Sequence, residues 1–149
     1  MTEAAEGFIR THTAVARPPL VPEIALHLAT EITPIWQATE AWLAKANIEP
    51  PFWAFAWPGG QALARLLLDE PARVAGRRVL DFAAGCGIGA IAAARSGAAR
   101  VEAADIDPLA AVAVRLNAAL NGVSVATLAE DLVGAPCRWD TVLAGDVCY

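Results

Sequence analysis

The second half of the chain alternates between short apolar runs of strand length and longer stretches with helical periodicity. The predicted elements are strands at 78–82, 100–105, 123–128 and 141–144, and helices at 88–96 and 108–120. Strands that alternate with helices at this spacing indicate right-handed crossovers and a parallel sheet. The pattern therefore predicts an α/β fold with a Rossmann-like, doubly wound parallel sheet.

The helix at 108–120 has the clearest boundaries. Asp107 can cap its first turn, Pro108 suits the first helical position, and Asn121-Gly122 closes it. The sequence stops at Tyr149, directly after the fourth predicted strand, whereas open doubly wound sheets usually have more strands. We therefore expect the sheet to be truncated after the fourth strand.

The first half of the chain has a different organisation. A proline-punctuated stretch at 17–22 precedes a predicted helix at 34–46, and a segment rich in Pro and Trp at 50–60 leads into an apolar helical pattern that stops before Pro71. We expect residues 1–75 to form a helical extension with a Pro/Trp-rich covering segment. Residues 76–149 are expected to form the Rossmann-like core.

Composition narrows the class of protein. With 56% hydrophobic and 18% charged residues the chain is suited to a compact fold, and its net charge of -5 gives it no general attraction to nucleic acid. The most apolar region is too short to cross a membrane, and the N-terminus lacks a targeting pattern. Three cysteines form neither a disulfide framework nor a metal-ligand pair, so we expect a cytoplasmic protein without a metal site.

The most specific chemistry lies where the first core strand ends. Asp81 closes that strand, and Ala83, Gly85 and Gly87 follow in a small-residue loop that opens a helix. Glycines permit positive φ and close approach of a ligand, and the helix N-terminus offers free N–H groups. These features fit any nucleotide cofactor.

Carboxylates at the ends of the next strands extend this site. Asp105 ends the second strand, where it can accept hydrogen bonds from both hydroxyls of a ribose. Asp131 follows the third strand and can reach an adenine amino group, although a solvated acidic pair with Glu130 explains it almost equally well.

Two cofactors compete for this pattern. Gly85-x-Gly87-x-x-Ala90 with Asp105 twenty residues on also satisfies a dinucleotide motif, and a tight turn without ligand is a third alternative. Asp81 would repel a pyrophosphate, whereas S-adenosylmethionine carries a cationic amino group and a sulfonium. We therefore predict S-adenosylmethionine, with Trp57 lining its pocket because aromatic faces attract cations.

The motif Asp81-x-Ala83-x-Gly85-x-Gly87 resembles motif I of class I, seven-β-strand, S-adenosylmethionine-dependent methyltransferases, with Ala83 in place of its first glycine. Asp105 and Asp131 match the next two cofactor motifs of that class. The segments 51–61, 21–24 and 146–149 resemble the bacterial lysine methyltransferases of the electron transfer flavoprotein β subunit. Proteins of this group are often labelled ribosomal protein L11 or nicotinamide N-methyltransferase-like.

The resemblance implies a protein-lysine N-methyltransferase acting on the electron transfer flavoprotein β subunit. It implies that Asp146 and Tyr149 meet the acceptor nitrogen, Asp146 orienting the amine and Tyr149 narrowing the channel. Such an enzyme must bind the ammonium, let it lose a proton and align it with the S–CH3 bond. A loop-capping Asp146, a non-catalytic cofactor-binding fragment and a methyltransferase for a small molecule or a ribosomal protein remain as alternatives.

Overall fold

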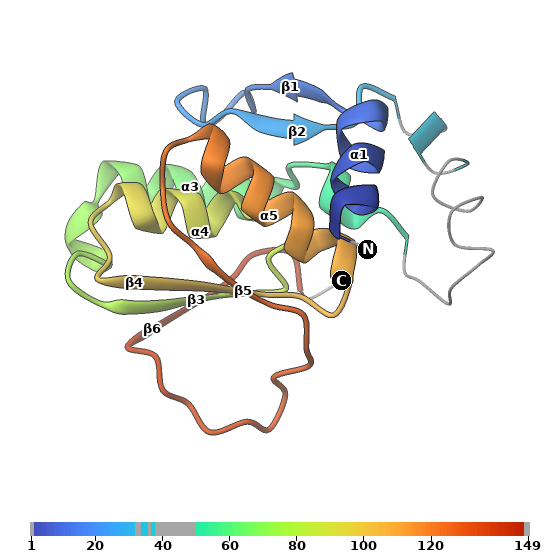
Figure 1. Ribbon diagram of the computed structural model, residues 1–149. Coiled ribbons are helices and arrows are strands. Elements are labelled where there is room, and N and C mark those ends of the chain that lie inside the picture. The colour runs from blue at the N-terminus through green and yellow to red at the C-terminus, as the bar shows by residue number, and fades with distance from the viewer. Residues whose placement is uncertain (1, 32–33, 36, 38–49, 148–149) are drawn as a thin grey trace.

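The computed structural model describes residues 2–31, 34–35, 37 and 50–147 (Figure 1). The helix predicted at 34–46 falls almost wholly outside the described residues, and Tyr149 lies outside them. The helical elements are α1 (Thr2–His12), η1 (Phe52–Ala54), α3 (Pro58–Asp69), η2 (Pro71–Arg73), α4 (Ile88–Arg95) and α5 (Pro108–Leu120). The strands are β1 (Ala14–Ala16), β2 (Leu26–Leu28), β3 (Arg78–Phe82), β4 (Arg100–Ala104), β5 (Ala126–Leu128) and β6 (Thr141–Ala144).

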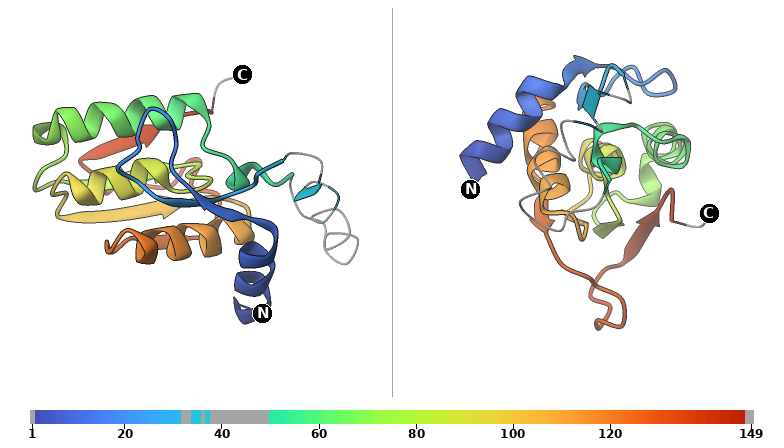
Figure 2. Two further views of the ribbon diagram at one scale, coloured as in Figure 1. Left: turned by 90° about the horizontal axis from the view of Figure 1, so that it is seen from above. Right: turned by 90° about the vertical axis from the view of Figure 1, so that its right-hand side faces the viewer.

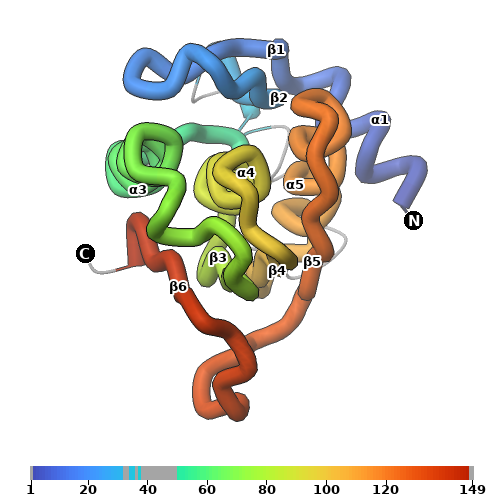
Figure 3. Tube along the Cα trace, turned by 90° about the vertical axis from the view of Figure 1, so that its left-hand side faces the viewer, coloured from blue at the N-terminus to red at the C-terminus, as the bar shows by residue number. Residues whose placement is uncertain are grey.

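The central sheet has four parallel strands in the order β5-β4-β3-β6. Helices α3, α4 and α5 form a layer on one face, and the connection from β5 to β6 crosses the other face (Figure 3). The chain moves outward from β3 through β4 to β5 and then returns to the far side of β3. This reversal is the topological switch point of a doubly wound sheet, so the predicted fold class is confirmed.

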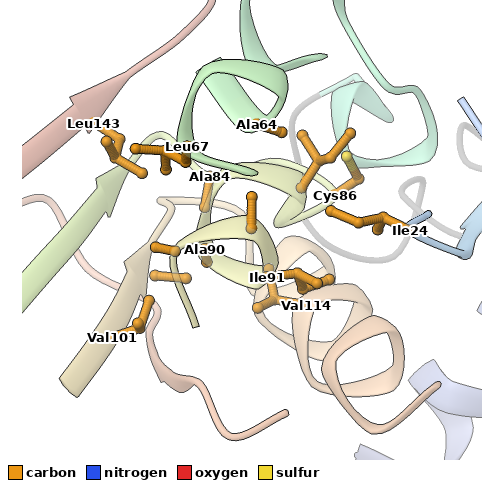
Figure 4. Packing of buried hydrophobic residues seen from close by; sticks show 14 of the residues in the cluster. Ile24, Ala64, Leu67, Ala84, Cys86, Ala90, Ile91, Val101, Val114 and Leu143 are labelled. Carbon is orange, nitrogen blue, oxygen red and sulfur yellow. The ribbon is translucent and has the colours of Figure 1, made fainter. Parts of the chain in front are cut away.

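The core forms between the sheet and its helical layer. Helix α4 lies between α3 and α5 (Figure 3), and its residues from Ile88 to Ala93 are buried. Ile91 of α4 packs with Val101 of the sheet, Val114 of α5 and Leu67 of α3 in one cluster (Figure 4). This packing fixes the start of α4, and therefore the loop that leads into it, against the neighbouring helices.

The N-terminal segment packs onto the same body. Helix α1 lies against α5, where Phe8 and Ile9 are buried with Leu109 and Leu116. Strands β1 and β2 pair antiparallel and lie over the helical layer (Figure 2). The sequence pattern did not predict this pair, because each strand has only three residues. Within the described part of the chain, no helix is both long and apolar enough to span a membrane.

Candidate functional site

The loop between β3 and α4 has the backbone conformation that its glycines permit. Gly85 has a φ of 52° and Gly87, the N-cap of α4, has a φ of 80°. A Cβ added at Gly87 would lie 2.9 Å from Cγ2 of Val114 on α5. Gly87 is therefore required both by its backbone conformation and by the close approach of α5.

Among the residues that the structure describes, Ala83 is the non-glycine residue with a positive φ, which is 52°. A side chain in this left-handed region costs about 1–2 kcal/mol. Ala83 stands where the loop motif has its first glycine, and its backbone has a positive φ, which glycine adopts more readily than alanine. Such strain is concentrated at ligand sites more often than elsewhere.

Asp105 is brought to the loop by the pairing of β3 with β4. The Gly85 N–H donates to Asp105 Oδ2 at 2.9 Å, and the Asp107 N–H donates to Oδ1 at 3.0 Å. Asp107 accepts from the Leu109 N–H at 2.8 Å and caps α5, as its position before Pro108 predicted. The carboxylate expected to face a ribose thus lies beside the loop expected to hold the nucleoside.

Asp81 is buried at the end of β3, with 6% of its surface exposed. The Ala90 N–H in the first turn of α4 donates to Asp81 Oδ2 at 2.8 Å. Burial raises the pKa of Asp81 to about 7; the hydrogen bond from Ala90 opposes this rise, and the negative charge of Asp105 adds to it. A cation placed against Asp81 would favour its ionised form.

A cavity of about 540 Å³ opens at the C-terminal ends of the strands, beside the switch point between β3 and β6. Ligand sites in doubly wound folds occupy this position, and the volume is that of a nucleoside-sized ligand site. Its described lining includes four carboxylates and no Lys, Arg or His. The carboxylates are those of Asp81, Asp105, Asp107 and Asp146.

Aromatic residues from the segment before α3 also line this cavity. Trp57 is 41% exposed, its Nε1–H donates to the Phe52 carbonyl at 2.9 Å, and its ring contacts those of Phe52 and Phe55. Trp53 is buried, and its Nε1 has no hydrogen-bond partner among the described residues. The segment predicted to cover the cofactor site thus lines the cavity.

Asp146 follows β6 and lies between the sheet and the start of α3. Its Oδ1 accepts from the Gly59 N–H at 2.9 Å and its Oδ2 from the Gly60 N–H at 2.8 Å. A Cβ on Gly59 would lie 2.8 Å from Oδ1, so glycine is needed for this approach. Asp146 thereby acts as a cap for α3, which has no side-chain cap of its own.

A capping role for Asp146 was one of the alternatives drawn from the sequence, but its partner at the start of α3 was not predicted. The signal available was the pair Gly59-Gly60 in a first turn without a capping side chain. The contact does not exclude the acceptor role predicted for Asp146, because a carboxylate has about four acceptor positions. That role stays a prediction, as does the role of Tyr149.

The cavity brings together most of the predicted site residues. Trp57, Asp81, Ala83, Gly85, Asp105 and Asp146 all line it. Gly87 supports the loop from behind, against Val114. Asp131 is exposed in the connection after β5, outside the cavity lining, and accepts from the Val133 N–H at 2.9 Å. Its role as an adenine ligand stays a prediction.

Cys86 lies inside the loop and lines the cavity. Its thiol is buried, and burial raises its pKa to about 12, so it stays protonated at neutral pH. Ile106 is 61% exposed beside Asp105 and also lines the cavity, although the sequence did not predict it as a site residue. A single apolar residue after a strand gives no sequence signal for this position.

A protein-family model described as ribosomal protein L11 methyltransferase (PrmA) matches residues 62–145, which include β3, the loop, Asp105 and the end of β6. The chain belongs to this family. The PrmA match confirms the methyltransferase resemblance drawn from Asp81-x-Ala83-x-Gly85-x-Gly87.

The similarity to individual relatives extends beyond the residues that the PrmA model matches. The chain is 46% identical to the electron transfer flavoprotein β subunit lysine methyltransferase of Xenopus laevis over 146 residues, and 41% identical to that of Homo sapiens over 156. These alignments include 96% and 97% of this chain but 58% and 55% of the relatives, so the chain spans little more than half their length.

Among solved structures, the ribosomal protein L11 methylase of Lactobacillus delbrueckii subsp. bulgaricus is 34% identical with a TM-score of 0.51. The match covers 59% of this chain and 46% of that one.

Proposed function

We propose that this chain binds S-adenosylmethionine and that the protein of which it is a part methylates lysine in the electron transfer flavoprotein β subunit. One observation carries the proposal: the cavity beside the glycine loop has four carboxylates, four aromatic rings and no cationic side chain in its described lining. A site of this composition suits a ligand with positive charge and an apolar, planar part.

The residues present fit this cofactor. Asp81 would accept hydrogen bonds from its ammonium, and Asp105, beside Gly85, would accept from its ribose hydroxyls. Trp57 and its aromatic neighbours would face the positive charge of its sulfonium. Asp131 is our proposed ligand for the adenine amino group, because it follows β5, the strand beside the one that Asp105 follows, and its side chain is accessible. The bound cofactor supplies the activated methyl group.

The same lining argues against a dinucleotide. A pyrophosphate at the glycine loop would lie near Asp81 and Asp105 without a cationic side chain in the described lining to offset its charge. Since both carboxylates are partly or fully buried, their repulsion is weakly screened by salt. This difference favours S-adenosylmethionine over a nicotinamide cofactor.

The acceptor site follows from the same electrostatics. A lysine approaches as an ammonium ion with a pKa near 10.4, and it becomes a nucleophile only after losing a proton. Asp146 lines the cavity and would bind and orient the amine, and Tyr149, three residues on, would narrow its approach. The relatives named as electron transfer flavoprotein β subunit lysine methyltransferases support a protein substrate. Ribosomal protein L11 is the second candidate, because the family model and a solved structure carry that name.

Two measurements test the proposal. Calorimetric titration of the chain should show binding of S-adenosylhomocysteine and no binding of NAD; tight NAD binding without a response to S-adenosylhomocysteine would refute the cofactor assignment. Transfer of labelled methyl groups by a protein that includes this chain should favour the flavoprotein β subunit over L11. Preferential labelling of L11 would transfer the assignment to the second candidate.

A further inference from the structure

Asn117 on α5 is fully buried, with 0% of its surface exposed, and both ends of its side-chain amide are hydrogen-bonded. Its Nδ2 donates to the Cys86 carbonyl at 2.9 Å, and its Oδ1 accepts from the His27 N–H at 2.8 Å. One side chain therefore joins two segments separated by about sixty residues: the glycine loop and strand β2 of the N-terminal hairpin.

The bond to Cys86 fixes the most conformationally demanding part of the loop. Cys86 lies between Gly85 and Gly87, which both have positive φ. Because a peptide unit is planar, holding the Cys86 carbonyl also sets the direction of the Gly87 N–H, which donates to the Ala84 carbonyl at 2.8 Å. Glycine-rich backbone has many accessible conformations, so a contact that selects one of them reduces the entropy lost when a ligand binds.

Asn121, one turn further along α5, makes a similar contact that does not touch the loop. Its Oδ1 accepts from the Ala25 N–H at 3.1 Å, and its Nδ2 donates to the Ala25 carbonyl at 2.6 Å. Asn117 thus attaches β2 to α5 and Asn121 attaches Ala25, the residue before β2, whereas of the two side chains Asn117 bonds to the loop. The pair provides a comparison in which hairpin attachment is lost with or without the loop contact.

We propose that Asn117 is a positioning residue that holds the glycine loop in its ligand-binding conformation through its bond to the Cys86 carbonyl. The proposal rests on the proposed function in one respect, since it takes this loop as the cofactor-binding loop. Asn117 lies outside the cavity lining and acts through Cys86.

The test compares Asn117→Ala with Asn121→Ala in this chain. Both substitutions should lower the melting temperature, because each leaves buried polar groups without partners. In Asn117→Ala we expect hydrogen exchange at the Gly85 and Gly87 amides to accelerate about tenfold or more, and the Kd for S-adenosylhomocysteine to rise by a similar factor. In Asn121→Ala, exchange should accelerate at Ala25, with the loop amides and the Kd within about twofold of the original chain.

Equal effects of the two substitutions on the loop amides would overturn the proposal. Asn117→Asp is a second variant, measured at alkaline pH where the introduced carboxyl is ionised, so that it keeps an oxygen for the His27 N–H and has no donor for the Cys86 carbonyl. Its loop amides should exchange faster while the His27 amide stays protected, and unchanged loop amides would refute the role. If both Asn117 variants unfold, the side-chain amide protons of Asn117 in the original chain provide the measurement. Slow exchange and a response to S-adenosylhomocysteine support the proposal, and exchange at the rate of an exposed asparagine overturns it.

The exchange measurements separate this proposal from the proposed function. If the original chain does not bind S-adenosylhomocysteine, the cofactor assignment fails. The dependence of the loop amides on Asn117 is still decided by their exchange rates.

Discussion

Replacing Asp81 by Asn should stabilise the chain at alkaline pH and weaken its proposed cofactor site. The substitution keeps the size of the side chain and an oxygen that can accept from the Ala90 N–H, and it removes the buried charge. The folded state holds the pKa of Asp81 at about 7, against 3.8 for an ordinary aspartate. Ionised Asp81 is therefore unfavourable in the unliganded fold.

The sign and size of the effect follow from proton linkage. Between pH 4 and pH 7 folded Asp81 keeps a proton that the unfolded chain has lost, so the free energy of unfolding falls as pH rises, and above pH 7 it stays lowered. The difference between 3.8 and about 7, at about 1.4 kcal/mol per pH unit, amounts to about 4 kcal/mol at pH 8. At pH 5.5 the same relation gives about 2 kcal/mol. The free energy of unfolding of Asp81→Asn, measured relative to that of the original chain, should therefore be about 2 kcal/mol higher at pH 8 than at pH 5.5.

Urea unfolding of both proteins at pH 5.5 and pH 8 measures this difference, and groups common to both cancel. Glu130→Gln, at an exposed position outside the cavity lining, serves as the control for removal of a carboxylate. Calorimetry should show S-adenosylhomocysteine binding weakened about tenfold or more by Asp81→Asn, because a charged hydrogen bond is lost. A stability difference that is equal at both pH values, or that shrinks as pH rises, would refute the reasoning about Asp81.

Three further substitutions test other parts of the structure. Ala83→Gly should raise the free energy of unfolding by about 1 kcal/mol, since relief of the positive φ exceeds the entropy that glycine adds to the unfolded chain; a loss in urea unfolding would contradict this. Gly87→Ala should lower the free energy of unfolding by about 2–3 kcal/mol. Gly122→Ala should lower it clearly less, because Gly122 has a positive φ but open space around it. Arg78 lowers the pKa of Asp140 to about 2, so this ion pair stabilises the fold above pH 4 and is lost toward pH 2; Asp140→Asn should flatten that part of the acid-unfolding curve.

The sequence predicted the core elements where their ends are marked locally. Helix α5 begins and ends as predicted because Asp107, Pro108 and Asn121 act on adjacent backbone. The strands of the sheet were also located, although β5 begins three residues later than predicted, at Ala126. Strands β1 and β2 were missed because they depend on pairing with each other and on contacts with α5, which no local pattern encodes.

The candidate site likewise has residues that could be predicted from local sequence and contacts that could not. Asp81, Gly85 and Asp105 could be placed together because parallel strands end at one edge of a sheet, so positions in the sequence translate into neighbours in space. The contact of Asp146 with Gly59 spans 87 residues and depends on where α3 begins relative to β6, a distance that the sequence does not encode. The bond from Asn117 to Cys86 spans 31 residues and was missed for a related reason, because it depends on how α5 packs against the loop.

The unfavourable features of this domain are concentrated in one place. Asp81 is a buried carboxylate, Ala83 has a positive φ, and Trp53 has a buried N–H without a partner among the described residues; all three line the same cavity. Each lowers the stability of the unliganded fold, and such costs cluster at ligand sites. A cationic ligand would favour the ionised form of Asp81 and so offset one of these costs. Ligand binding should therefore stabilise the fold, and the bond from Asn117 to the Cys86 carbonyl holds part of the loop on which that binding depends.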